Sequence, residues 1–126
     1  MRHHNSPELA KPNGYTHAVE ASGGRTVYVS GQVSLDAAGK LVGAGDFEAQ
    51  ARRVFENLKA ALAAAGASLA HVVKITVFVT DLSGLASFRK LRNEYFPTNP
   101  PASSLVQVAG LVLPELLIEI EAVAVL

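Results

Sequence analysis

The chain has 126 residues, and its 11 basic and 11 acidic side chains give a formal net charge of zero and a pI near 6.9. We therefore expect no nucleic-acid partner, because such proteins usually carry a basic excess, and the lack of cysteine excludes disulfides and thiolate chemistry. No apolar run approaches the length of a membrane span and no apolar segment follows the basic N-terminus, which predicts a cytoplasmic protein with no membrane partner.

The length predicts a single domain over residues 1–126. Hydrophobic residues make up 49% of the chain, which is a large share for a small soluble domain. A compact monomer would leave part of this surface exposed, so we expect it to be covered by other copies of the chain. At the start, residues 1–13 contain Pro7, Pro12 and Asn13 and are predicted to form an irregular arm.

Strands are predicted to follow the arm. Residues 16–20 and 26–29 have strand-like composition, and the intervening Ser22-Gly23-Gly24 suits a hairpin turn. A second short turn is predicted at residues 36–39, where Asp36 and Gly39 flank two alanines.

The first helix has the clearest pattern. Its apolar stripe recurs every three or four residues and consists of Phe47, Ala51, Val54, Phe55, Leu58, Leu62 and Ala65. Asp46 is a suitable N-cap and Gly66 a suitable C-terminal stop. A second helix is predicted over residues 83–96, ended by Pro97.

Strands are also expected over residues 72–80, 104–108 and 117–125. Each helix thus lies between strands that are far enough apart for a crossover connection. The order predicts an α+β domain, with two amphipathic helices on one face of a single mixed sheet. The helix-free face is then a natural contact between subunits.

Four short segments carry a family resemblance: Gly14-Tyr15, Ser30-Gly31-Gln32, Pro100-Pro101-Ala102-Ser103-Ser104 and Ile118-Glu119-Ile120-Glu121. Together they resemble the YjgF/Rid family, the reactive-intermediate deaminases, and the resemblance extends from about Gly14 to Val125. It implies a chorismate-mutase-like fold assembled as a homotrimer, with small-molecule pockets between neighbouring subunits.

Two glutamates lie on the last predicted strand. Glu119 and Glu121 are two residues apart and so share a face. One interpretation is a half-polar strand whose carboxylates meet solvent. The resemblance implies instead that Glu119 positions water at a bound substrate, with Glu121 in a structural role.

The resemblance also implies that Ser30 and Gly31 form a pocket wall and that Tyr15 lines the same pocket. Glycine would let a ligand approach the main chain closely. Without the resemblance, these residues are equally well explained as a polar strand end and an aromatic side chain packed on its neighbours.

Ser103 stands where deaminating members of the family have an arginine that grips the substrate carboxylate. Serine cannot make this planar two-pronged contact, so an ordinary 2-imino acid is a poor substrate prediction. Arg89 aligns to a helix position near the pocket, and Arg92 lies one turn further on. Either both arginines extend into solvent beside Glu94, or Arg89 reaches the pocket and replaces the cation.

No histidine has a partner at metal-ligand spacing, and no dinucleotide or phosphate-loop motif occurs, so we expect no metal and no cofactor. The sequence predicts a homotrimer whose pockets bind a small polar metabolite. Whether it is an enzyme stays open: one alternative is hydrolysis at an imine or enamine C–N bond, and the other is a non-catalytic binding or regulatory module. An endoribonuclease or translation inhibitor, described for some relatives, is a weaker alternative.

Overall fold

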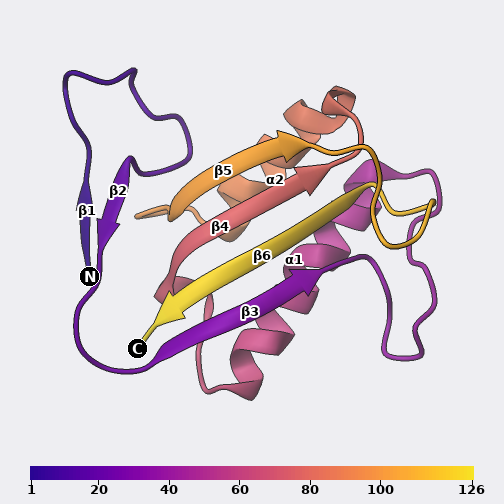
Figure 1. Cartoon of the computed structure of the whole chain (residues 1–126), viewed down its shortest axis with the longest axis horizontal. Helices are drawn as coiled ribbons and strands as arrows, with labels where there is room; N and C mark the ends of the chain where they lie inside the picture. The colour runs from indigo at the N-terminus through magenta and orange to yellow at the C-terminus, as the bar shows by residue number, and fades with distance from the viewer.

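A computed structural model describes residues 1–126, and its largest element is a four-stranded mixed sheet with two helices on one face (Figure 1). The sheet has the order β3–β6–β4–β5, formed by Thr26–Gln32, Ile118–Val125, Val72–Val79 and Ala102–Gln107. Strand β6 is antiparallel to β3 and β4, and β4 is parallel to β5. Helix α1 (Phe47–Ala64) lies in the connection from β3 to β4, and α2 (Leu85–Tyr95) lies in the connection from β4 to β5. The predicted α+β class, with both helices on one face of a mixed sheet, is confirmed.

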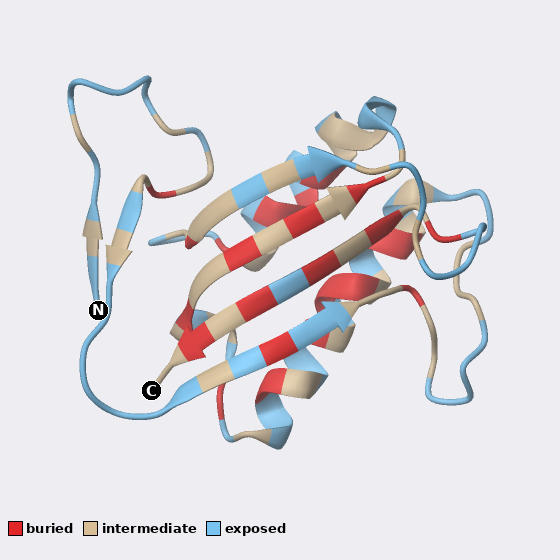
Figure 2. Cartoon of the chain, viewed as in Figure 1, coloured by how far each residue is buried: buried red, intermediate tan, exposed pale blue.

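The core lies between the helices and one face of this sheet. In β6, Ile118, Ile120, Ala122 and Ala124 are buried, and the residues between them are more exposed. The burial colours accordingly alternate along this strand (Figure 2). Helix α1 begins as predicted, since the Asp46 carboxylate accepts a hydrogen bond from Ala49 N at 3.1 Å. The helix ends before Gly66, whose φ of 75° lies in the left-handed region.

Helix α2 is shorter than predicted. Its expected first residues, Ser83 and Gly84, belong to a separate 3₁₀ turn, η2 (Leu82–Gly84), in which Asp81 accepts a hydrogen bond from Ser83 N at 2.7 Å and caps the turn. Helix α2 then ends at Tyr95, ahead of Pro97. The turn predicted at residues 36–39 is present, where Asp36 N donates to Lys40 O at 2.9 Å.

The N-terminal region differs from its prediction. Residues 1–13 are not wholly irregular, because Arg2–His4 forms strand β1, which pairs antiparallel with β2 (Ala18–Glu20) in a separate two-stranded sheet. The hairpin predicted across residues 22–24 is not formed. Gly23 and Gly24 do adopt positive φ, but they carry the chain away from β2, and β3 pairs with β6 instead.

The structure extends the N-terminal arm beyond the predicted residues 1–13 to include β2, and this longer arm, residues 1–20, is attached to the body of the domain near the start of β5 (Figure 1). Thr16, which is buried, donates from its backbone nitrogen to Pro101 O at 3.1 Å and from its hydroxyl to Pro100 O. Arg92 of α2 donates to Asn13 O at 2.9 Å. These bonds place the neighbouring Tyr15 beside α2. Neither helix of the structure has both the length and the apolar character that crossing a membrane would require.

Candidate functional site

The residues predicted to form a pocket lie in two groups on opposite faces of the four-stranded sheet. Glu119 is paired with Phe78 and points to the open face. Ser103 is paired with the fully buried Ile75, so it points to the face that the helices cover. A single chain therefore cannot bring these two side chains together.

The first group surrounds Glu119. Its carboxylate lies over Gly31, because a Cβ built on Gly31 would be 2.0 Å from Glu119 Oε2 and 2.7 Å from Cδ. A register shift between Val29 and Gln32 places this glycine beside β6. Ser30 is exposed next to it, and Tyr28 is 79% exposed further along β3. The arrangement is a half-buried carboxylate beside accessible main chain, open on one side.

The second group forms a cleft of about 260 Å³ between the arm, α2 and β5. It brings together three predicted residues that are distant in sequence: Tyr15, Arg89 and Ser103. The remaining lining residues are Leu85, Phe88, Arg92 and Leu105. Four of the seven come from α2 at spacings of three and four, so one helical face forms a wall of the cleft. We call this the Tyr15 cleft.

Arg92 was not expected in this position. Of the two arginines, Arg89 is exposed at the edge of the cleft, whereas Arg92 is only 6% exposed. The alternative in which both extend into solvent beside Glu94 is wrong for Arg92, because its side chain is buried. Glu94 pairs with Arg52 at 3.4 Å. A sequence signal did exist: Arg92 lies four residues after buried Phe88, on the apolar stripe of α2.

The buried guanidinium of Arg92 has few hydrogen-bond partners. Its Nη2 donates to Asn13 O at 2.9 Å, and its Cζ is 5.7 Å from the centre of the Phe88 ring. Its Nε is buried without any hydrogen-bond partner. Burial lowers the pKa of Arg92 from its ordinary value, and the neighbouring charge of Arg89 lowers it further.

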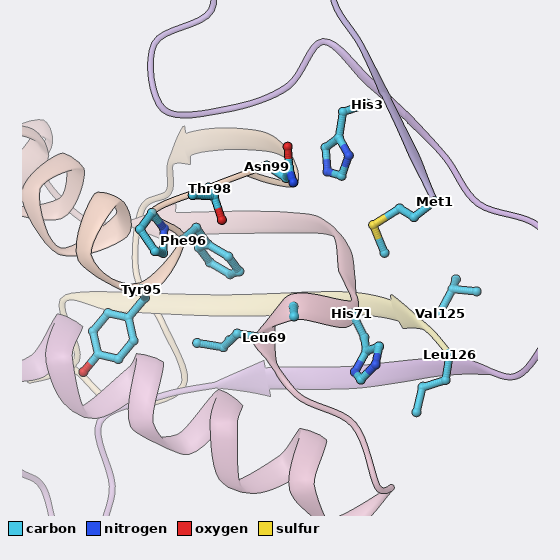
Figure 3. A pocket seen from close by; sticks show the side chains of 12 residues that line it. Met1, His3, Leu69, His71, Tyr95, Phe96, Thr98, Asn99, Val125 and Leu126 are labelled. Carbon is cyan, nitrogen blue, oxygen red and sulfur yellow. The ribbon is translucent and has the colours of Figure 1, made fainter.

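A larger cavity, of about 640 Å³, lies where the arm meets the C-terminal end of β6 (Figure 3). Met1 and His3 of the arm face it from one side, and His71 and Leu126 lie on the other. None of the predicted site residues lines it. The His71 ring accepts a hydrogen bond from Ser68 N at 3.0 Å, and no three His, Asp or Glu side chains in the structure are grouped to hold a metal ion.

The larger of the two cavities is therefore not the one with the charged side chains. The larger cavity is lined by two histidines but by no Asp, Glu or Arg side chain, whereas the Tyr15 cleft is lined by two arginines. We take the Tyr15 cleft and the Glu119 carboxylate as the candidate site, because these two surfaces carry the groups able to bind an anion and to accept a proton from water.

Comparisons with known proteins agree with the fold. Residues 5–126 match the family model described as endoribonuclease L-PSP. The protein DfrA of Myxococcus xanthus is 44% identical over 111 residues, which cover 88% of this chain and 84% of that protein.

Two solved structures are also similar. The conserved Rid-family protein YyfB from Yersinia pestis is 42% identical, with a TM-score of 0.93 over 99% of this chain and 98% of the other. A putative endoribonuclease from Thermotoga maritima is 43% identical, with a TM-score of 0.76 over 89% of this chain and 86% of the other. Although the two identities are nearly equal, the backbone of this chain is more similar to that of YyfB, as the higher TM-score shows.

Proposed function

The chain belongs to the endoribonuclease L-PSP family, to which the Rid proteins also belong, and from this premise we propose that it forms a homotrimer with a small-molecule pocket at each subunit interface. Each pocket would combine Glu119, Ser30 and Gly31 of one copy with the Tyr15 cleft of the next. The bound molecule is a small polar metabolite, and the proposed reaction is hydrolysis of an imine or enamine C–N bond.

The observation that carries this proposal is the placement of Glu119 and Ser103 on opposite faces of one sheet. Each group has part of what the reaction needs, since the open face offers a carboxylate and the cleft offers cations and hydroxyl groups. A second copy packed against the open face would bring the two groups together and would remove the site from bulk water.

In the proposed reaction, Glu119 accepts a proton from a water molecule as the water oxygen bonds to the C=N carbon. Glu119 then returns this proton to the imine nitrogen, which gives a carbinolamine. As the carbinolamine C–N bond breaks, the hydroxyl proton passes through Glu119 to the nitrogen, so that ammonia leaves and a carbonyl group forms. The overall balance is imine plus water giving carbonyl compound plus ammonia. Ser30 and the Gly31 main chain would orient the ligand beside the carboxylate.

Replacement of Glu119 tests the reaction. Freshly generated imines would be mixed with the wild type, Glu119→Gln and Glu121→Gln, and ammonia release would be followed. Glu119→Gln is expected to lose about a hundredfold or more of any acceleration, which is the usual range for a general base. Glu121 points to the same face but is exposed, so Glu121→Gln should retain activity. Equal rates for all three proteins would refute the role of Glu119.

Assembly is tested separately by light scattering. A homotrimer has three times the 13.2 kDa mass of one chain. A stable particle of single-chain mass at micromolar concentration would refute the shared pocket, because Glu119 and Ser103 could then never meet.

A non-catalytic metabolite-binding module is the second candidate. It is favoured by Ser103, which provides no cation on β5, and by Arg92, whose Nη2 is engaged with Asn13 O. Saturable binding of a small molecule, with no acceleration across a broad panel of imines and enamines, would support the module. Ribonuclease activity is weakly supported, because the formal net charge of zero provides no excess of cations for a phosphate backbone.

A further inference from the structure

We propose that Arg92 is the anion-binding residue of the Tyr15 cleft, and that the ligand is a small organic carboxylate with an apolar body. The inference rests on the proposed function in one respect, that the cleft is part of the ligand pocket. What it adds is the residue that recognises a carboxylate in this chain, which has Ser103 in place of the family arginine.

The first argument is that the charge of Arg92 has no counterion. The ion pairs of the structure are His4–Glu20, Arg52–Glu94, Lys59–Glu56 and Lys90–Glu48, and none of them involves Arg92. Burial of an unpaired charge is costly, so buried cations normally lie beside a carboxylate. Arg92 is instead opposed by Arg89, a second cation lining the same cleft. An anionic ligand would compensate both charges.

The second argument is that Arg92 has unused hydrogen-bond donors. A guanidinium carries five N–H groups, and here a single bond is formed, from Nη2 to Asn13 O. The Nε atom is buried without a partner, and Nη1 makes no hydrogen bond either. Nε and Nη2 share one edge of the guanidinium, whose parallel donors match the two oxygens of a carboxylate, and the Nε donor of this edge is free.

The third argument concerns the shape of the ligand. Leu85, Phe88 and Leu105 line the cleft with apolar side chains, while Tyr15 and Ser103 contribute hydroxyl groups. This lining favours a planar or branched apolar body carrying one carboxylate over a heavily charged phosphate ester, which would require more donors. In this chain the cation, Arg92, thus comes from α2. In family relatives the corresponding arginine is expected on β5, at the position of Ser103.

Calorimetric titration provides the test, with benzoate as the anionic probe and benzamide as its neutral counterpart of similar shape. The wild type should bind benzoate about tenfold or more tightly than benzamide, because hydrogen bonds to charged groups are the stronger kind. Arg92→Gln should abolish this preference. Lys90→Gln is the matched control on the same helix, because Lys90 lies outside the cleft and its side chain is 69% exposed. It should change benzoate affinity less than about threefold at roughly 0.15 M salt, since exposed charges are screened.

Two results would overturn the proposal: no preference of the wild type for benzoate over benzamide, or a preference that survives in folded Arg92→Gln. Because replacement of a buried arginine can impair folding, 4-bromobenzoate soaked into wild-type crystals gives an independent measurement. Its bromine signal should lie in the Tyr15 cleft with the carboxylate on Arg92, and a signal elsewhere would contradict the assignment.

The two proposals can fail separately. Arg92-dependent benzoate binding without imine turnover would support the anion site and refute the reaction. Turnover that depends on Glu119, without any preference for carboxylates, would support the reaction and refute the anion site.

Discussion

Gly31 and Glu119 are in direct contact across β3 and β6, so close that a Cβ on residue 31 would lie 2.0 Å from Glu119 Oε2. The glycine is therefore the reason that the carboxylate can lie against the main chain of β3. Its neighbour Ser30 is exposed beside it, at the edge of the open sheet face. Any ligand that reaches Glu119 from this side also meets the backbone of Gly31.

Gly31→Ala is expected to reduce the proposed imine hydrolysis by about tenfold or more while leaving the fold intact. The added methyl group would push the flexible Glu119 side chain away, and a small displacement of a catalytic group is costly. The measurement is ammonia release together with the thermal unfolding midpoint. Gly110→Ala is the control, since a Cβ there meets nothing within 4 Å. Unchanged turnover in Gly31→Ala would show that the position of Glu119 does not matter.

Gly14→Ala is expected to lower the free energy of unfolding by about 1–3 kcal/mol, since Gly14 has a φ of 79°. It should also weaken benzoate binding, because its Cβ would lie 2.1 Å from Arg92 Nη2. Urea unfolding and calorimetry measure the two effects. Gly23→Ala shares the positive φ, at 70°, but its Cβ meets nothing within 4 Å, so it should leave benzoate affinity unchanged. If Gly14→Ala and Gly23→Ala bound benzoate with the same affinity, this would argue against Arg92 as the residue that binds benzoate.

Tyr95→Phe is expected to destabilise the protein more at pH 7 than at pH 3. The Tyr95 hydroxyl donates to Glu56 Oε2 at 2.7 Å and lowers the pKa of that carboxyl from its ordinary 4.5. A lowered folded-state pKa stabilises the fold above the unfolded value, and this contribution is lost as the pH falls through the folded value. Urea unfolding of both proteins at the two pH values measures this. If Tyr95→Phe lowered the free energy of unfolding equally at both pH values, the hydrogen bond to Glu56 would not be coupled to the protonation of that carboxyl.

Phe55→Ala is expected to lower the free energy of unfolding by about 3–5 kcal/mol, the usual cost of removing a buried aromatic ring. Phe55 is fully buried and packs against Phe88, Tyr95 and Phe96, at centroid distances of 6.1, 4.6 and 6.2 Å. It therefore joins α1 to α2. Val112→Ala, at a position 77% exposed, should change stability by no more than about 0.5 kcal/mol. Chemical denaturation gives both values. Similar losses of stability in Phe55→Ala and Val112→Ala would contradict the role of Phe55 in joining the two helices.

Much of the fold could be predicted because the relevant signals are local. The stripe from Phe47 to Leu62, the Asp46 cap and the Gly66 stop define α1 from its own residues. The alternation of Ile118 and Ile120 with the two glutamates correctly predicts which side of β6 is buried. The resemblance likewise named Tyr15, Arg89 and Ser103, and the structure brings these three together in one cleft. Whether they bind a ligand stays a prediction.

The sequence alone determined the two helices and the strands of the main sheet, because those choices depend on periodicity and capping within a few residues, but it did not predict β1 or the η2 turn. Tertiary structure alone decided the partners of β2 and β3, because any strand can pair with several others and Gly23-Gly24 permits more than one direction of the chain. It also decided the burial of Arg92. Residue type predicts a solvated arginine, whereas the backbone of Asn13 and the ring of Phe88 enclose this one.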